Sequence, residues 1–317
     1  MKNMIKKGLY YLLHDPKMGG VKILNILVGK FSPFFADRTY IKLRYRLRVG
    51  RWLNLKNPKT FNEKLQWLKL YNRNPDYTIM ADKVKVKDWV AARIGQEYII
   101  PTLGVWDNPD DIDFESLPNQ FVLKCNHNSG KGMYICKDKS SMNISAIKKE
   151  LSKGLRENYF LHGREWPYKN IPKRILAEAF MKEDDGSDLK DYKVFCFNGK
   201  PEIIQVDYDR FVNHKRNIYD TSWNYLNLEI EYPTDPNVII RKPAKLDKLL
   251  YFCSVLSKGV PHLRVDFYSI GGKLYFGELT FFHGSGLEHF NPEEWNAKLG
   301  NLITLPDVTN LNTNGMP

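Results

Sequence analysis

The chain has 317 residues, 43% hydrophobic and 26% charged, a composition typical of a globular protein that buries its own core. Its four cysteines have no paired spacing, which argues against a disulfide framework or a zinc site and favours a reducing compartment. The formal net charge is +12, and residues 1–51 carry twelve Lys and Arg against two Asp, so an anionic partner is indicated.

Residues 1–34 interleave basic residues with large apolar ones. Lys22 and Lys30 interrupt the apolar runs, which are therefore much shorter than the ~20 residues that span a bilayer. Two interpretations remain open: an amphipathic segment on an anionic membrane surface, and a helical lobe with a solvated basic face. No small-residue cleavage site follows, so we expect a cytoplasmic protein, with the inner face of the cell membrane as the surface it would contact.

The next elements are predicted as helices. Residues 37–51 form a basic helix, and Thr60 with Glu63 predicts a capping box at the start of another. Asp82 is predicted to cap a helix that ends at Gly95. Two later helices are expected over residues 143–157 and 244–258.

From residue 98 onward, short apolar segments bounded by turns predict strands. They cover residues 98–101, 121–125, 133–136, 175–180, 192–197, 202–206, 263–270 and 273–280. Asn198-Gly199 and Gly271-Gly272 are typical of hairpin turns. Helices mixed with antiparallel hairpins predict the α+β class.

The first motif that carries chemistry is the strand 121–125 with the loop after it. Lys124 in an apolar strand is costly unless it meets an anion. Gly130 and Gly132 in the following Ser-Gly-Lys-Gly would let backbone N–H groups approach phosphate. The spacing is not that of a Walker loop, and a lysine extending from an edge strand to solvent explains the pattern equally well.

The second motif pairs Asp266 with Glu278 across the predicted hairpin. A two-residue turn would place Asp266 opposite Gly277, whereas a three-residue loop, or a bulge with a glycine at positive φ, would place it opposite Glu278. Two opposed carboxylates repel each other, so the second register requires a cation between them. Mg²⁺ is the natural one because it prefers oxygen ligands and accompanies nucleotide phosphates.

Two weaker motifs complete the set. Glu178 is the one acid in an apolar strand and could accept a hydrogen bond from adenine or ribose. The loop 281–286, Phe-Phe-His-Gly-Ser-Gly, follows the Glu278 strand directly. It could offer N–H groups to an oxyanion, and it could equally be a simple turn.

In this order, the motifs resemble those of the ATP-grasp superfamily. The segments 57–65, 121–124, 191–193 and 277–281 resemble more narrowly the TupA-like branch, which is associated with teichuronopeptide and other bacterial surface-polysaccharide synthesis. The resemblance covers roughly residues 35–295 and implies a two-lobed fold with a nucleotide cleft between antiparallel sheets. Residues 1–80 would be a basic helical region, 81–180 the first lobe and 181–317 the second.

The resemblance implies ATP and Mg²⁺ as cofactors and an ADP-forming carboxylate–amine ligase that works through an acyl phosphate. The residues that it implies for the nucleotide are Lys83, Lys124, Gly130, Gly132, Glu178, Asp191 and Lys193. For the metal it implies Asp266 and Glu278, and Thr280 stands where the superfamily usually has asparagine, so one firmly held magnesium ion is expected. Arg264, His283 and Ser285 are implied to stabilise the charge that develops in transfer.

The implied substrates are an anionic glycan or lipid-linked saccharide, with a uronic acid as its carboxylate, and an amino acid as the amine. Three other interpretations compete with this one. A sugar or polysaccharide kinase would share every nucleotide residue, and a glycosyltransferase of the same pathway would bind a nucleotide sugar instead. A scaffold or nucleic-acid binder would explain the basic end but not the opposed carboxylates, so we expect no nucleic-acid partner.

Overall fold

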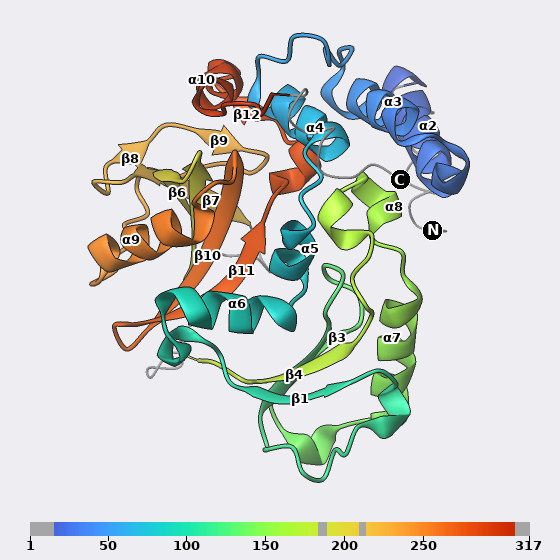
Figure 1. Ribbon diagram of the computed structural model, residues 1–317, viewed down its shortest axis with the longest axis vertical. Coiled ribbons are helices and arrows are strands. Elements are labelled where there is room, and N and C mark those ends of the chain that lie inside the picture. The colour runs from blue at the N-terminus through green and yellow to red at the C-terminus, as the bar shows by residue number, and fades with distance from the viewer. Residues whose placement is uncertain (1–15, 183–188, 209–213, 308–317) are drawn as a thin grey trace.

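The computed structural model describes residues 16–182, 189–208 and 214–307, and it is built around two antiparallel sheets (Figure 1). The smaller sheet has four strands in the order β1-β4-β2-β3. Its strands are β1 (Thr102–Trp106), β2 (Phe121–Cys125), β3 (Met133–Cys136) and β4 (Ile175–Ala179). Helix α7 (Ile144–Arg156) packs against β2 and β3, and Phe121, Leu123 and Leu151 lie in the core between them.

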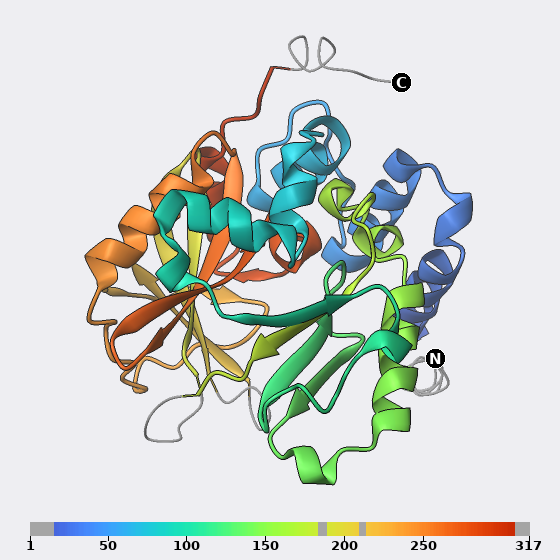
Figure 2. The ribbon, with the colours of Figure 1, turned by 60° about the horizontal axis from the view of Figure 1, so that its bottom comes forward.

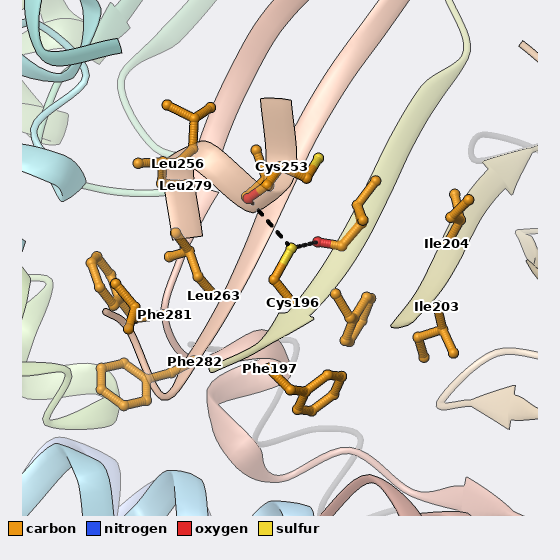
Figure 3. Close-up of a cluster of buried hydrophobic side chains, with 14 of the residues drawn as sticks. Cys196, Phe197, Ile203, Ile204, Cys253, Leu256, Leu263, Leu279, Phe281 and Phe282 are labelled. Carbon is orange, nitrogen blue, oxygen red and sulfur yellow. Dashed lines mark hydrogen bonds between the residues drawn. The ribbon is translucent and has the colours of Figure 1, made fainter. Parts of the chain in front are cut away.

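The larger sheet has six strands in the order β11-β10-β5-β6-β7-β8. They are β5 (Asp191–Phe197), β6 (Lys200–Tyr208), β7 (Lys215–Asp220), β8 (Tyr225–Leu226), β10 (His262–Ile270) and β11 (Lys273–Thr280). Helix α9 (Leu246–Ser257) packs against the central strands β5, β6 and β10. Figure 3 shows part of this core, where the Cys196 thiol lies 3.9 Å from the carbonyl oxygens of Val194 and Cys253. All four cysteines are buried free thiols.

The remaining elements pack around the two sheets. They are α2 (Pro16–Lys30), α3 (Asp37–Val49), α4 (Phe61–Tyr71), α5 (Asp76–Ala81), α6 (Lys85–Ile94), α8 (Phe160–Gly163), α10 (Glu294–Leu302) and a small sheet of β9 (Glu229–Ile230) with β12 (Phe290–Asn291), with short 3-10 helices between them. Figure 2 shows α2 and α3 beside α7 and α8. Arg164 joins these parts, because its Nη2 donates to the carbonyl of Ser32 at 2.6 Å and its Nε lies 2.9 Å from a carboxylate oxygen of Asp37.

Most predicted elements are present. The α+β class is confirmed, as are the basic helix 37–51, the helices 143–157 and 244–258, and the capping box of Thr60 and Glu63. The helix that ends at Gly95 is present as α6, but its N-cap is Val84 and not the predicted Asp82, whose Oδ1 accepts from the N–H of Val84 at 2.9 Å in the turn before the helix. No helix in the described ranges is long and apolar enough to cross a membrane.

One predicted strand was wrong, and the strands β1, β7, β8, β9 and β12 were not predicted. Residues 98–101 are not a strand: a 3-10 helix covers Gln96–Tyr98, and the strand begins only at Thr102. Strand β7 was missed because Arg216 and Asn217 give it a polar sequence, although both side chains are buried. The sheets lie within residues 102–179 and 191–280, and the lobe boundaries at residues 80 and 180 stay a prediction.

Candidate functional site

A cavity of about 370 Å³ is lined by strands of both sheets and by the loop after β2. The predicted residues that line it are Lys83, Lys124, Gly130, Asp191, Lys193, Asp266 and Glu278. Cations and carboxylates that are almost 200 positions apart in the sequence therefore share one space. Seven of the thirteen residues predicted for the site meet here, and the other six surround this group or lie behind it.

The two predicted metal carboxylates lie directly opposite each other on β10 and β11. The turn at Gly271-Gly272 has two residues, both at positive φ, and Ile270 pairs with Lys273. The register changes later, between Asp266 and Phe267, where Gly277 is the extra residue of a β-bulge. The opposed register was predicted correctly, but the bulge lies within the strand instead of at the turn.

Gly277 permits this bulge because it has no side chain. A β-carbon built at Gly277 would lie 3.1 Å from the carbonyl oxygen of Asp266, which is tighter than ordinary contact. The glycine therefore lets the two strands approach each other beside the carboxylates. A glycine at position 277 therefore permits the backbone geometry that places Asp266 opposite Glu278.

The cation between the two carboxylates is the guanidinium group of Arg264. Its Nε and Nη2 each donate to one oxygen of Asp266 at 2.7 Å, and Nη2 also donates to Oε1 of Glu278 at 2.8 Å. Burial raises the pKa of Asp266 to about 7 even beside Arg264. Burial also opposes the charge on Glu278, but Arg264, Lys83 and Lys193 outweigh it and lower the pKa of that carboxyl.

The carboxylate pair fits a magnesium ion that arrives with a nucleotide. No group of three or more His, Cys, Asp or Glu that could hold a metal exists among the described residues. Magnesium does not require one, because it is usually held by one or two carboxylates together with phosphate oxygens. Glu278 is 46% exposed, and in the described part of the chain only its Oε1 takes part in hydrogen bonds, from Arg264 and from Thr280 at 3.2 Å. The hydroxyl group of Thr280 thus contacts Glu278, a candidate metal ligand, and lies behind it.

Two lysines and one glutamate form two ion pairs at the edge of the cavity. Glu178 on β4 forms ion pairs with Lys124 on β2 and, at 2.6 Å, with Lys87 on α6. Burial opposes the charge on Glu178, but the two lysines outweigh it and lower its pKa. Glu178 lines a smaller cavity of apolar and charged side chains that shares Lys83, Lys124, Gly277 and Glu278 with the larger one. The ion pair with Lys124 lets Glu178 orient that lysine. The predicted contact of Glu178 with adenine or ribose stays a prediction.

Lys83 and the glycine loop are fixed to each other. The ammonium group of Lys83 donates to the carbonyl of Asn128 at 2.5 Å, and burial lowers its pKa. Gly130 has φ +83° with open space where a side chain would begin, which suits a loop that approaches a ligand. Gly132 has φ +63°, and a β-carbon there would lie 2.9 Å from the Cα of Gly154 on α7. Gly132 is therefore required for packing between the loop and α7.

The other face of the cavity is supported by a line of buried charged groups. On β5, Lys193 forms an ion pair with Asp191 and lies 3.1 Å from Asp207 on β6. Arg216 on β7 contacts Asp207 at 2.8 Å and Glu288 at 3.2 Å. These contacts continue from Arg216 to Glu288, which lies behind Arg264. Each buried charge in the line therefore has an opposite charge beside it.

His283 lies at the end of this line and not at the cavity surface. Its side chain is only 2% exposed; Nδ1 lies 2.7 Å from Arg264 Nη1 and Nε2 lies 2.6 Å from Glu288. Burial lowers the pKa of His283, which favours a neutral ring that accepts from Arg264 and donates its Nε2 proton to Glu288. His283 therefore lies behind Arg264 in the structure, and its predicted direct role in the transfer stays a prediction.

Ser285 lies in a 3-10 turn (His283–Gly286) with a positive φ of +56°. Its carbonyl accepts from Lys69 at 2.8 Å and from Gln66 at 2.9 Å, and its hydroxyl lies 2.9 Å from the Lys69 ammonium group. Burial lowers the pKa of Lys69 to about 8, against the opposing effect of Glu165. Lys69 was missed from the sequence, although a lysine four residues after Leu65 on the apolar face of a helix was the available signal.

The comparisons with known proteins agree with this arrangement. A family model described as TupA-like ATPgrasp matches residues 63–304, which include every site residue discussed above. The predicted resemblance to the ATP-grasp superfamily is confirmed by that match. No curated protein matches the chain.

Several solved ATP-grasp structures are similar over part of their length. D-alanine–D-alanine ligase from Bacillus anthracis, complexed with ATP, is 16% identical with a TM-score of 0.39, over 64% of this chain and 54% of that one. The corresponding ligase from Helicobacter pylori is 13% identical with a TM-score of 0.41, over 78% and 70%. The ATP-grasp ligase PsnB, complexed with a phosphomimetic variant of its minimal precursor, Mg and ADP, is 11% identical with a TM-score of 0.39, over 87% and 70%. The chain thus spans about half the length of the first of these proteins.

Proposed function

The chain belongs to the TupA-like ATP-grasp family, and from that premise we propose that it is an ATP- and Mg²⁺-dependent ligase that joins a carboxylate to an amine. The single observation that carries the proposal is the cavity where Lys83 and Lys124 face Asp266 and Glu278. Lys83 and Lys124 bring positive charge to the cavity, and Oε2 of Glu278 takes part in no hydrogen bond within the described residues. Phosphate oxygens would bind the two lysines, and a magnesium ion that arrives with the phosphates would bind the two carboxylates that Arg264 orients.

The residues of the cavity divide the work. Lys83 and Lys124 hold the phosphate oxygens, and backbone N–H groups near Gly130 approach the same groups. Asp266 and Glu278 would hold the metal, which would neutralise the β- and γ-phosphates. Asp191, at the start of β5, is the proposed partner of the ribose hydroxyls.

The reaction that we propose has two steps. An oxygen of the substrate carboxylate attacks the γ-phosphorus of ATP, the bond to ADP breaks, and an acyl phosphate forms. The amine nitrogen then attacks the acyl carbon, phosphate leaves, and the amine loses a proton. Arg264 donates to both carboxylates, and its Nη1 contacts His283, so we propose that it holds Asp266 and Glu278 in place for the metal. Its contact with the charge that develops in transfer stays a prediction.

The substrates that we propose are a uronic acid in an anionic bacterial surface glycan and an amino acid. A lipid-linked saccharide at the inner face of the cell membrane is consistent with the basic residues of segment 1–51. Helix α2 and residues 31–34 also expose apolar side chains on the outside of the protein, among them Phe34, which is 84% exposed. Residues 1–15 of the predicted membrane segment lie outside the described residues.

A screen of uronic acids with amino acids tests the proposal, with ADP release and product mass read together. A ligase gives ADP and a product whose mass equals the two substrates minus water. A kinase, which uses the same cavity, gives ADP and a phosphorylated sugar without needing the amine. ADP release that never depends on an amine, or binding of a sugar nucleotide in place of ATP, would overturn the ligase assignment.

A further inference from the structure

A second cavity, of about 650 Å³, lies between the N-terminal helices and α7–α8. Five cationic side chains line it, from α2 (Lys30), α3 (Arg44), the glycine loop (Lys131) and α7 (Lys153 and Arg156). Its single carboxylate is that of Glu157. Lysine and arginine in the last turn of α7 complement that helix end, but this does not explain the cations that α2, α3 and the loop add.

Most of these cations lack a carboxylate partner. Lys131 lies 2.6 Å from Glu157 and Lys153 lies 3.0 Å from Glu150, whereas Lys30, Arg44 and Arg156 form no ion pair with any residue in the described ranges. Like charges collected in a concave site repel each other and raise the local concentration of anions. The cavity is therefore electrostatically incomplete without an anionic occupant.

Neutral hydrogen-bonding side chains line the cavity beside the cations, among them Asn25, Tyr40 and Asn158. The one lining carboxylate, Glu157, is only 6% exposed, and its Oε1 already contacts Lys131 at 2.6 Å and His162 at 3.0 Å. A saccharide that carries carboxylates can use both kinds of lining group, because its carboxylates accept from the cations and its hydroxyl groups form hydrogen bonds with the neutral side chains. An inorganic anion would fill only a small part of a cavity of about 650 Å³.

The position of this cavity connects it to the nucleotide site. Lys131 lines both cavities, and its loop neighbours Asn128, Ser129 and Gly130 line the nucleotide cavity. His127 and Asn128 of this loop are held to the carbonyl groups of Glu157 and Gly154. An acidic chain in the second cavity would therefore end close to the phosphates in the first.

We propose that this second cavity binds the acidic saccharide part of the acceptor, with several carboxylates spread over cations from four elements. The assignment rests on the proposed ligase function for its catalytic meaning, but binding itself needs no ATP. A flat lipid surface fits less well, because the cations line a concave site. A volume of about 650 Å³ is in the range of small-ligand sites.

The test measures binding of trigalacturonate to the full chain by calorimetry, with neutral maltotriose and inorganic phosphate as comparison ligands. The variant carries Lys30→Ala and Arg156→Ala, which leave no buried carboxylate without its partner. Its control carries Arg241→Ala and Lys258→Ala, two exposed cations elsewhere, so the net charge changes equally. We expect trigalacturonate binding to weaken at least ~10-fold in the cavity variant and to remain unchanged in the control.

Three outcomes would overturn the proposal. They are equal weakening in both variants, wild-type binding of phosphate as tight as trigalacturonate, and loss of binding to phosphatidylglycerol vesicles in the cavity variant with no saccharide binding in the wild type. An unhydrolysable ATP analogue is titrated in parallel. Failure of the wild type to bind this analogue would contradict the proposed function alone, whereas normal analogue binding with no saccharide binding would contradict the second site alone.

Discussion

The two cavities of this protein differ in whether their charged side chains are paired with opposite charges. In the nucleotide cavity nearly every charged side chain already has an opposite partner, as Arg264 has in Asp266 and Glu278. In the cavity beside α2, five cations share one carboxylate. Neutralised groups hold their geometry before a ligand arrives, which is what a reaction centre requires. Unneutralised cations attract and retain an anion, which is what a substrate site requires.

The comparison also separates two consequences of mutation. Removing one member of a neutralised buried pair leaves its partner uncompensated, so stability or chemistry is lost. Removing a cation from the basic cavity relieves repulsion, so folding is preserved and only binding changes. The predictions below test the first half of this contrast, and then the outer surface of the basic region.

The largest effect is expected at Glu278. Glu278→Gln keeps an oxygen for Arg264 but removes the negative charge that would hold the metal, so ATP turnover should fall about 1000-fold, the loss of several kcal/mol in the transition state. Lys124→Ala should have a comparable effect through the phosphates. Turnover is measured as ADP release, and thermal unfolding checks that both variants fold.

Glu294→Gln is the control for Glu278, because it removes an acid from the surface of α10 where its partner is Lys298. It should keep wild-type turnover. Wild-type turnover in Glu278→Gln would show that the carboxylate pair serves structure alone, and the proposed metal site would then be wrong.

The sequence was sufficient to predict where these carboxylates lie. Alternating residues place Arg264 and Asp266 on one face of a strand, and repulsion between opposed acids implies a cation, so the register could be predicted before the fold was known. The position of the bulge could not, because Gly277 is required only by the approach of the Asp266 carbonyl in the folded sheet. The cation predicted between the carboxylates was Mg²⁺, whereas the guanidinium group of Arg264 occupies that place in the structure.

Partners contributed by distant helices could not be predicted. Lys87 of α6 reaches Glu178, and Lys69 of α4 reaches Ser285, only because tertiary packing brings these helices to the sheet edges. The helices themselves have clear signals, such as the capping box at Thr60. The basic cavity could not be predicted from the sequence either, because its cations come from four elements whose relative positions depend on the whole fold.

The second effect is expected in the stability of the charge line behind Arg264. Burial opposes the charge on Glu288, but His283 and Arg216 outweigh it and lower the pKa of Glu288 to about 2. A carboxyl with a lowered pKa stabilises the folded state above its unfolded pKa and loses this contribution as pH falls toward 2. At pH 6, Glu288→Gln should therefore reduce the free energy of unfolding by about 3 kcal/mol.

Urea unfolding of wild type and Glu288→Gln between pH 6 and pH 3 measures this difference. The gap should narrow as pH falls below about 4, since the wild-type carboxyl then begins to bind a proton in the unfolded state. Glu115→Gln, at an exposed acid, should show no such gap. If the difference in unfolding free energy is the same at every pH, then packing, and not charge, stabilises this region.

The smallest effect concerns the outer surface of the N-terminal helices. Val21, Leu24, Leu27, Phe31 and Phe34 follow one another at helical spacing, and all are exposed. Leu24→Ser with Phe34→Ser should weaken binding to phosphatidylglycerol vesicles about 10-fold, because two apolar side chains no longer enter the lipid surface. Vesicle sedimentation measures the change, and ATP turnover in solution should stay the same.

Ile239→Ser is the control, because Ile239 is 94% exposed on another part of the protein and its replacement removes apolar surface away from the N-terminal helices. Weaker vesicle binding in the α2 variant alone would assign the apolar surface to the membrane and leave the cations of the second cavity for the saccharide. If both variants bind vesicles as the wild type does, the membrane proposal fails. The basic residues of the N-terminal helices would then act through the second cavity, where removal of Lys30 and Arg156 already tests them.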